Sequence, residues 1–264
     1  MTASPMEGIN PLFSLAGQTA LITGATRGIG LAIARCLAMA GARVLVSSES
    51  PADCYRVAAE LRSEGLQADA LPADMSRRDQ VMDLAERVER AGGARILLCN
   101  AGVSLHTGPL HRASDDDWDR TMTINLRSAH WLTSALAPRM ADQGGGSIIL
   151  MASLSALRGN RSIGLYGMSK AALAQLARNL AVEWGPENIR ANAIAPGLID
   201  TDLAKPFHDD PDLLARRMAM TPLRRMGSVQ EVAAVALLLA SPGGAFITGQ
   251  TLVVDGGTLI TDGS

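Results

Sequence analysis

The sequence predicts an α/β fold, with residues 1–264 forming one doubly wound, Rossmann-type domain around a seven-stranded parallel sheet. Short apolar segments alternate with amphipathic helical stretches along the whole chain. These segments are apolar throughout, which is typical of parallel strands that helices cover on both faces. A glycine cluster and a helix follow the first segment, as in the βαβ unit that binds a dinucleotide.

The expected strands are seven short segments, and a helix is expected after most of them. Gly41 and Gly65 end the first two helices, and Gly92-Gly93 follows the third. Ligands of such sheets bind at the carboxyl ends of the strands, so functional motifs are expected just after each strand. The strands are residues 19–22, 43–46, 68–71, 95–99, 147–151, 189–194 and 250–254, and the helices are 28–40, 52–64, 77–91, 116–142, 165–184 and 229–240.

Composition excludes several other classes of protein. Hydrophobic residues make up 47% and charged residues 19%, which argues against a disordered chain. A net charge of -2 gives no support for a nucleic-acid partner or an anionic membrane surface. The longest apolar run, 232–240, is too short to span a bilayer, and the first residues lack the pattern of a signal peptide. The cysteines have no metal-ligand spacing and fit a reducing compartment, so no metal and a cytoplasmic location are expected: Cys36, Cys54 and Cys99.

Three glycines lie between the first strand and the first helix. Gly24 permits a tight turn, Gly28 lets the backbone approach a pyrophosphate, and Gly30 allows close packing of helix on strand. The helix N-terminus supplies donors for an anion. The spacing is G-x-x-x-G-x-G and not the commoner G-x-G-x-x-G, so a glycine-rich turn without a ligand stays the alternative.

The adenosine end of a dinucleotide is expected after the second strand. Glu49 lies 19 positions after Gly30, where a carboxylate can bond a ribose hydroxyl and repel a 2′-phosphate. Arg27 acts in the opposite sense, because a guanidinium can pair with that phosphate. Glu49 favours NAD over NADP as the cofactor, although a solvated loop carboxylate is an equally good interpretation.

A serine, a tyrosine and a lysine follow the fifth strand. Tyr166 and Lys170 are four residues apart and therefore lie on one helix face, while Ser153 directly follows the strand. An ammonium near a phenol lowers its pKa from about 10, and a serine hydroxyl can hold a substrate oxygen beside it. The three side chains together predict a proton-transfer site for a carbonyl or an alcohol. Taken singly, the tyrosine is more often a packing residue and the lysine a surface residue.

These motifs resemble the short-chain dehydrogenase/reductase family from about residue 15 to 257. The resemblance rests on T-G-A-T-R-G-I-G at 23–30, on N-A-G at 100–102, on Ser153 and on the Y-x-x-x-K from Tyr166 to Lys170. It implies a Rossmann-type sheet, a nicotinamide cofactor and hydride exchange between a secondary alcohol and a ketone.

The resemblance also implies a role for each catalytic residue. Tyr166 would be the general acid or base, and Lys170 would lower its pKa and bond the nicotinamide ribose. Ser153 would hold the substrate oxygen. Asn125 matches a fourth catalytic position, which organises a water-linked proton relay, whereas alone it would be interpreted as a structural amide.

The remaining cofactor contacts are likewise implied by the resemblance. Asp74 matches an acid that contacts the adenine amine, and residues 196–201 match a segment that holds the carboxamide. Ser48 stands where NAD-preferring members carry aspartate, and Glu49 where NADP-preferring members carry arginine. The expected cofactor-binding residues are Gly24, Arg27, Gly28, Ile29, Gly30, Ser48, Glu49, Asp74, Met75, Asn100, Ala101, Gly102, Tyr166, Lys170, Pro196, Gly197, Ile199 and Thr201.

The segment 202–223 is polar and interrupted by prolines, and we expect it to form a lid over the substrate. Several leucines and a phenylalanine could line an apolar pocket beneath it or could simply be core. A moderately apolar hydroxy or keto compound is the expected substrate. The candidate pocket residues are Leu154, Leu165, Leu198, Leu203 and Phe207, with His106, Asn160 and Arg161 as polar contacts.

Three functions remain open at this point. The favoured one is a nicotinamide-dependent alcohol dehydrogenase or ketone reductase. An epimerase or dehydratase on the same scaffold is the second. The third is a non-catalytic nucleotide-binding regulator, which the complete serine, tyrosine and lysine set disfavours. The family is usually tetrameric or dimeric, so a homotetramer or homodimer is expected, with 229–240 as a candidate interface.

Overall fold

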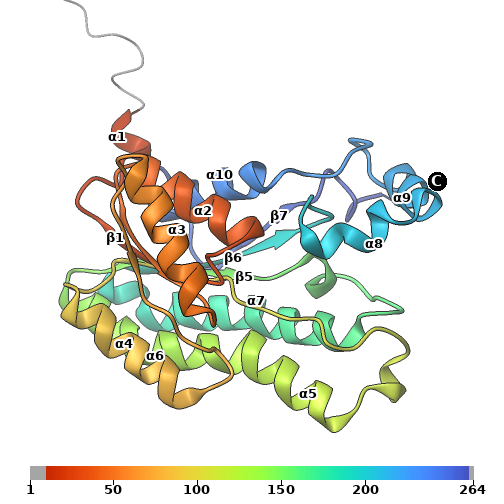
Figure 1. Cartoon of the computed structure of the whole chain (residues 1–264), viewed down its shortest axis with the longest axis horizontal. Coiled ribbons are helices and arrows are strands. Elements are labelled where there is room, and N and C mark those ends of the chain that lie inside the picture. Colours follow the sequence, from red (N-terminus) through yellow and green to blue (C-terminus); the bar gives the residue numbers. More distant parts are fainter. Residues whose placement is uncertain (1–9, 262–264) are drawn as a thin grey trace, which may run out of the picture.

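The computed structural model describes residues 10–261, and its centre is a seven-stranded, fully parallel sheet (Figure 1). The predicted fold class is confirmed. The ends of the predicted 1–264 domain, residues 1–9 and 262–264, lie outside the described residues. The sheet order is β3-β2-β1-β4-β5-β6-β7. The strands are β1 (Thr19–Thr23), β2 (Arg43–Ser47), β3 (Ala68–Ala70), β4 (Ile96–Cys99), β5 (Gly146–Met151), β6 (Ile189–Pro196) and β7 (Thr251–Val254).

Most strand positions are apolar because both faces of the sheet are covered, with exceptions such as Asp69 in β3 and Arg190 and Asn192 in β6. In β1, Ala20 and Ile22 belong to the core on one face and Leu21 to the core on the other. The same alternation places Leu98 of β4 on the first face and Leu97 on the second. Successive side chains of a strand point to opposite faces, so a buried parallel strand needs apolar residues at every position.

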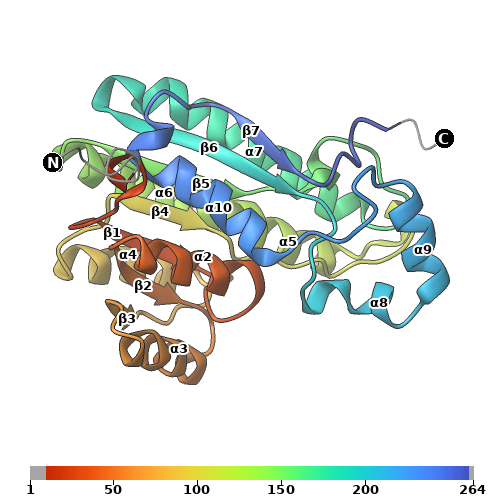
Figure 2. The same ribbon diagram turned by 90° about the horizontal axis from the view of Figure 1, so that it is seen from above.

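Three long helices cover each face of the sheet (Figures 1 and 2). One face carries α2 (Gly28–Met39), α3 (Pro51–Ser63) and α10 (Val229–Ala240). The other carries α4 (Arg78–Arg90), α6 (Ser128–Asp142) and α7 (Gly164–Trp184). Within residues 10–261, no helix is long and apolar enough to cross a membrane.

The predicted helical stretch 116–142 is helical in the structure, but part of it is a π turn that was not predicted. It consists of α5 (Asp115–Met122), a π-helical turn (Thr123–Arg127) and α6. The hydroxyl of Ser128 donates to the carbonyl of Ile124 over 2.6 Å at this turn. A π turn inserts one residue into the helix, which apolar periodicity does not reveal. The π turn packs beside α7, the helix that carries Tyr166 and Lys170.

The carboxyl ends of the strands meet at one edge, and the loops that leave them build the candidate site. The strand order reverses between β1 and β4, which is where ligands of doubly wound sheets bind. After β6, residues 202–223 run past this edge as a 3-10 turn (Asp202–Ala204), α8 (Lys205–His208) and α9 (Pro211–Ala219), as Figure 2 shows. The short remaining elements are α1 (Asn10–Phe13) and the 3-10 turns Leu110–Arg112, Leu154–Ala156, Gly185–Glu187 and Pro242–Gly244.

Candidate active site

The loop between β1 and α2 is built around glycines that no larger residue can replace. Gly24 and Gly28 have φ values of 62° and 53°, which side chains other than hydrogen rarely adopt. A Cβ on Gly24 would lie 2.9 Å from Nδ2 of Asn100. A Cβ on Gly30 would collide with the carbonyl oxygen of Gly24 and with the same amide. Gly30 therefore permits the close packing of helix on strand that the sequence predicted.

Asn100 ties the end of β4 to this loop. Its Nδ2 donates to the carbonyls of Thr23 and Gly24 over 3.1 and 3.0 Å. The hydroxyl oxygen of Thr23 accepts from the backbone N–H groups of Asn100 and Ala101, each over 3.1 Å. The sequence analysis did not single out Thr23 for this contact, although a polar residue at the end of an apolar strand was a usable signal. Asn100 and Ala101 thus hold the glycine loop in place.

The start of α2 fits the pyrophosphate of a dinucleotide. Its N-cap residue Arg27 makes no side-chain cap bond among residues 10–261, whereas Ser50 and Ser228 cap α3 and α10. A Cβ on Gly28 would have Thr201 as its nearest neighbour, with Cγ2 3.6 Å away. The N–H groups of the first turn therefore face a space that Thr201 borders, and helix N-termini of this kind bind phosphate. The side chain of Ile29 packs on the core, so only its backbone is available there.

The carboxyl ends of β2 and β3 border the position expected for the adenosine. The carbonyl of Ser48 accepts from the N–H of Ala73 over 2.9 Å, which holds the two strand ends together. Asp74 Oδ1 accepts from the N–H of Ser76 over 2.8 Å, and Met75 is buried. The Asp74 carboxylate thus already organises the turn, and its second oxygen is the one left for a ligand.

Glu49 and Arg27, which bear on the cofactor choice, are both exposed. The pKa of Asp53 at the start of α3 is lowered, chiefly by its hydrogen bonds with Ser50 and Arg56, and Arg27 contributes to the lowering. The charge of Arg27 therefore extends from the glycine loop toward α3.

Lys170 is fully buried beside the carboxyl end of β5. Its Nζ donates to the carbonyl of Met151 over 2.7 Å and lies 5.5 Å from the centroid of the Tyr166 ring. Burial lowers the pKa of Lys170 to about 8. At neutral pH the amine therefore stays mostly protonated, and the predicted pairing of Lys170 with Tyr166 is present in the structure.

Tyr166 differs from expectation in the direction of its pKa. The phenol is half-buried, and burial raises its pKa, while a side-chain hydrogen bond with Ser153 offsets part of that rise. We expected a lowered pKa from the ammonium of Lys170. The loss of water around the phenol is the largest cause of the rise, because it disfavours the charged phenolate, while Nζ of Lys170 lies over the ring, 5.5 Å from its centroid.

Asn125 lies on the π turn, and its amide is completely engaged. Oδ1 accepts from the N–H of Val103 over 2.7 Å, and Nδ2 donates to the carbonyl of Val103 and to Oγ of Ser169 over 2.8 and 2.9 Å. A Cβ on Gly102 would lie 3.0 Å from Nζ of Lys170 and 3.3 Å from Oδ1 of Asn125. Gly102 therefore leaves the space in which the lysine amine and the asparagine lie side by side.

The hydroxyl of Ser153 is hydrogen-bonded to Tyr166 and to the backbone. Its Oγ accepts from the N–H of Ser155 over 3.1 Å and is half-buried near Tyr166. An oxygen that already accepts from the backbone can still direct its own O–H elsewhere. The hydroxyls of Ser153 and Tyr166 thus form a pair that can bond one substrate oxygen.

The segment 196–201 divides into two parts. Gly197 donates to the carbonyl of Val254 over 2.9 Å, so Pro196 and Gly197 pair with the end of β7. Ile199 is buried, and only Thr201 comes next to the glycine loop. Of the predicted carboxamide segment, the structure therefore brings Thr201 to the dinucleotide side, whereas the side chain of Ile199 belongs to the core.

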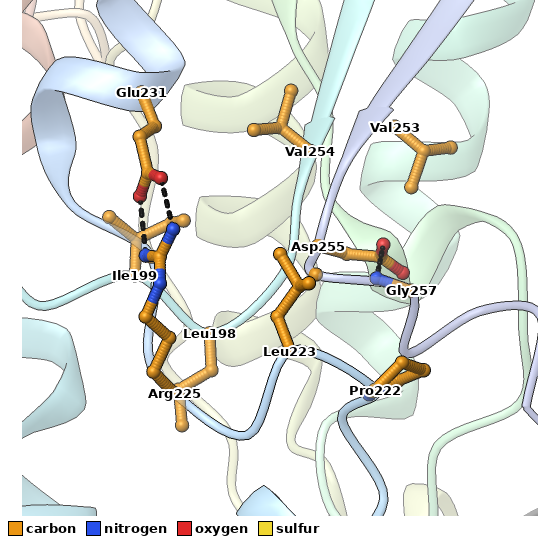
Figure 3. Close-up of a pocket in the computed structure, with 12 residues that line it drawn as sticks. Leu198, Ile199, Pro222, Leu223, Arg225, Glu231, Val253, Val254, Asp255 and Gly257 are labelled. Carbon is orange, nitrogen blue, oxygen red and sulfur yellow. Dashed lines mark hydrogen bonds and ion pairs between the residues drawn. The ribbon is translucent and has the colours of Figure 1, made fainter.

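A cavity of about 430 Å³ lies between this segment and the end of β7 (Figure 3). Leu198 and Asp255 line it, and the ion pair of Arg225 with Glu231 lies at one end. Ser153, Tyr166 and Lys170 do not line it. Leu154 and Leu165 are almost completely buried, so they are core residues. The side chain of Leu203 lies outside the described residues.

Comparison with known proteins agrees with the fold and the motifs. The profile of a family described as Enoyl-(Acyl carrier protein) reductase matches residues 24–258. Dehydrogenase/reductase SDR family member 4 of Bos taurus is 38% identical, over 98% of this chain and 92% of its own. The chain belongs to the short-chain dehydrogenase/reductase family of oxidoreductases.

Two solved structures extend the likeness. A gluconate 5-dehydrogenase of Burkholderia cenocepacia, in complex with NADP and tartrate, is 35% identical with a TM-score of 0.92, over 96% of this chain and 99% of that one. A 7α-hydroxysteroid dehydrogenase, in complex with NADH and 7-oxo glycochenodeoxycholic acid, is 37% identical with a TM-score of 0.89, over 94% and 96%. The relatives therefore include complexes with both types of nicotinamide cofactor.

Proposed function

We propose that the chain transfers a hydride between a nicotinamide dinucleotide and a secondary alcohol or ketone, with Tyr166 as general acid or base. The observation that carries this proposal is the buried amine of Lys170, 5.5 Å from the ring of Tyr166 and hydrogen-bonded to the end of β5. Burying a lysine amine without a carboxylate partner costs folding free energy. Such a group beside a phenol is therefore a candidate for a functional role.

The proton moves between Tyr166 and the substrate oxygen. When bound, the nicotinamide supplies or receives the hydride. A phenol with a raised pKa is protonated at neutral pH, which is the form that donates to the oxygen of a ketone during reduction. Ser153 donates a hydrogen bond to the same oxygen, and the ammonium of Lys170 stabilises the phenolate that remains.

Asn125 positions the elements that carry the candidate catalytic residues. Its amide joins Val103 to Ser169, so it fixes α7 against the loop after β4. The family resemblance gives Asn125 a water-linked proton relay, and we assign that role to the π turn on which it lies. A π turn leaves backbone carbonyls with altered partners, which suits a chain of ordered waters.

The cofactor would lie across the carboxyl edge from β3 to β6. The start of α2 would hold the pyrophosphate, Ser48, Glu49, Asp74 and Met75 would border the adenosine, and Thr201 would contact the nicotinamide end. We propose NAD as the preferred cofactor, because the carboxylate of Glu49 opposes a 2′-phosphate. Arg27 limits the strength of that preference.

We further propose that residues 1–264 work as one unit in the cytoplasm, with 202–223 as a lid over the substrate. A homotetramer or homodimer is the expected assembly, as in the family. The assignment as a lid is supported by α9, whose inward side chains are only half-buried.

A dehydrogenase screen tests the proposal. Secondary alcohols and ketones of varied size are offered with NAD or NADP, and the absorbance of the reduced cofactor is followed. We expect turnover of at least one class, with stoichiometric change of cofactor and a higher kcat/KM with NAD. Turnover of a sugar or hydroxy compound without net cofactor change would instead support an epimerase or dehydratase.

A further inference from the structure

The helix α9 carries an arginine on the side that faces the protein. Leu213, Leu214, Arg217 and Met218 are half-buried, whereas the neighbouring Arg216 is exposed. Positions four apart share one face of a helix, so Arg217 belongs to an otherwise apolar inward stripe. Among residues 10–261 its Nε is buried and has no hydrogen-bond partner. A buried guanidinium nitrogen without a partner is rare and calls for a ligand.

A second arginine lies nearby on the loop that carries Ser153. Arg158 is half-buried, five residues after Ser153. Burial lowers the pKa of Arg217, and the charge of Arg158 lowers it further, so the two cations are close enough to repel each other. In the part of the chain that the structure describes, neither guanidinium has a carboxylate within ion-pair distance.

The negative charge of Asp255 also acts on Arg217, but this carboxylate already has other partners. Asp255 opposes the lowering of the pKa of Arg217. Its two oxygens accept from the N–H groups of Gly257 and Leu259 over 2.8 and 2.6 Å, and Figure 3 shows the first of these bonds. Two cations and one fixed anion leave a net charge of about +1, which one monoanion neutralises.

The loops that carry Arg158, Arg217 and Asp255 leave the same edge of the sheet as those that carry the candidate catalytic residues. Arg158 follows β5 and Asp255 follows β7. Just after the end of α9, the hydroxyl of Thr221 is hydrogen-bonded to that of Thr258 in the C-terminal segment over 3.0 Å. The loop after β5 and the connection after β6 both leave this edge, so Arg158 and Arg217 belong to the same group of loops as Ser153 and Tyr166.

We propose that Arg217 and Arg158 bind a carboxylate carried by the substrate, which makes the substrate a hydroxy or keto acid. The proposal rests on the proposed function, whose hydride transfer requires the hydroxyl or keto group. A planar guanidinium presents paired donors that match a carboxylate, and a monoanion balances the local charge where a phosphate dianion would exceed it. Binding of the acid would also give Nε of Arg217 its missing partner.

Isothermal titration calorimetry tests this binding without requiring turnover. Straight-chain carboxylates from acetate to decanoate, and their methyl esters, are titrated into the full-length protein with and without NAD. We expect saturable binding of at least one carboxylate and binding of its ester weaker by roughly 10- to 100-fold, since a hydrogen bond to a charged group is lost. Equal affinity for acid and ester, or no carboxylate binding below 10 mM, would overturn the proposal.

Variants separate this site from general electrostatic attraction. Arg217→Met should weaken carboxylate binding by roughly 10- to 100-fold and Arg217→Lys by less, whereas the matched exposed change Arg216→Met should leave it unchanged. Equal losses in Arg216→Met and Arg217→Met would overturn the proposal. Thermal melting checks that each variant is folded. If Arg217→Met does not fold, Arg217→Lys, which retains the positive charge, is measured in its place.

The proposed function fails separately. A protein that binds carboxylates through Arg217 but turns over no hydroxy or keto acid, with either cofactor, would keep this site and lose the oxidoreductase assignment. Conversely, the protein could turn over neutral ketones with no preference for acids, while Arg217→Met leaves carboxylate binding unchanged. That result would support the oxidoreductase assignment and overturn the carboxylate site.

Discussion

The glycine loop after β1 and the helix α9 over the opposite side of the site differ in how completely their polar groups are partnered. At the loop, each donor of the Asn100 amide and backbone is engaged by Thr23 or Gly24. At α9, Arg217 keeps a buried nitrogen without a partner among residues 10–261. The hydrogen bonds of the first region are therefore satisfied without a substrate, whereas the second region has a positively charged group that can still bind one.

The difference separates what a shared cofactor needs from what an individual substrate needs. Backbone approaches such as that of Gly30 to the carbonyl of Gly24 tolerate no side chain and impose one geometry. A half-buried arginine on a short helix can be exchanged without disturbing the sheet. Residues 24–258 match one family profile, yet the two solved relatives were bound to tartrate and to a steroid acid. If the proposed carboxylate site is correct, substrate choice depends on the second region.

Removing the phenol tests whether chemistry can be lost while the cofactor region stays intact. Tyr166→Phe should lower kcat by about 10²- to 10⁴-fold, the usual contribution of a general acid, because no other hydroxyl takes its place beside Lys170. The chain has one other tyrosine, the exposed Tyr55, so Tyr55→Phe is the matched control. Steady-state kinetics and a cofactor titration measure the two effects.

Retained activity of Tyr166→Phe would refute the mechanism. Loss of cofactor binding together with activity would mean that the two regions are not separable. Unchanged cofactor affinity, within about twofold, with turnover lost only in Tyr166→Phe is the expected pattern.

A methyl group on Gly30 tests the geometry of the cofactor region. Gly30→Ala should lower the free energy of unfolding by about 3 kcal/mol and weaken cofactor binding, because its Cβ meets the backbone of Gly24. Gly185 has no neighbour within 4 Å of such a Cβ and has helical backbone angles, so Gly185→Ala is the control. Urea denaturation compares the variants, and equal stability of the two would contradict the close packing.

Titration of Lys170 gives the smallest expected effect. Burial holds its pKa at about 8 in the folded protein, below the value of about 10.4 of an unfolded lysine. The unfolded chain therefore binds more protons between these values, and stability rises with pH across that window. The wild type should gain about 2 kcal/mol relative to Lys170→Met between about pH 7 and pH 9.5.

The control for this titration is the other lysine of the chain, the exposed Lys205. Lys205→Met should follow the wild-type stability at every pH in denaturant unfolding experiments. A stability difference between the wild type and Lys170→Met that does not change with pH would show that the lysine is not buried as a cation at pH 7.

Much of the architecture was predictable, and the exceptions have a common cause. The seven apolar segments and the pair of Tyr166 and Lys170 follow from local patterns, and the structure contains them. The π turn at Asn125 was not predictable, because one inserted residue barely changes apolar periodicity. The bond from Asn125 to Val103 joins residues that only the fold brings together.

By itself, the sequence determined the parallel sheet, the glycine loop and the residue types of the chemical site, because periodicity and turn chemistry act over a few neighbouring residues. Tertiary structure alone decided that burial raises the pKa of Tyr166 and lowers that of Lys170, and that the charges of Arg158 and Asp255 act on Arg217. Solvation and charge depend on what surrounds a group in space, and segments distant in the chain supply those surroundings.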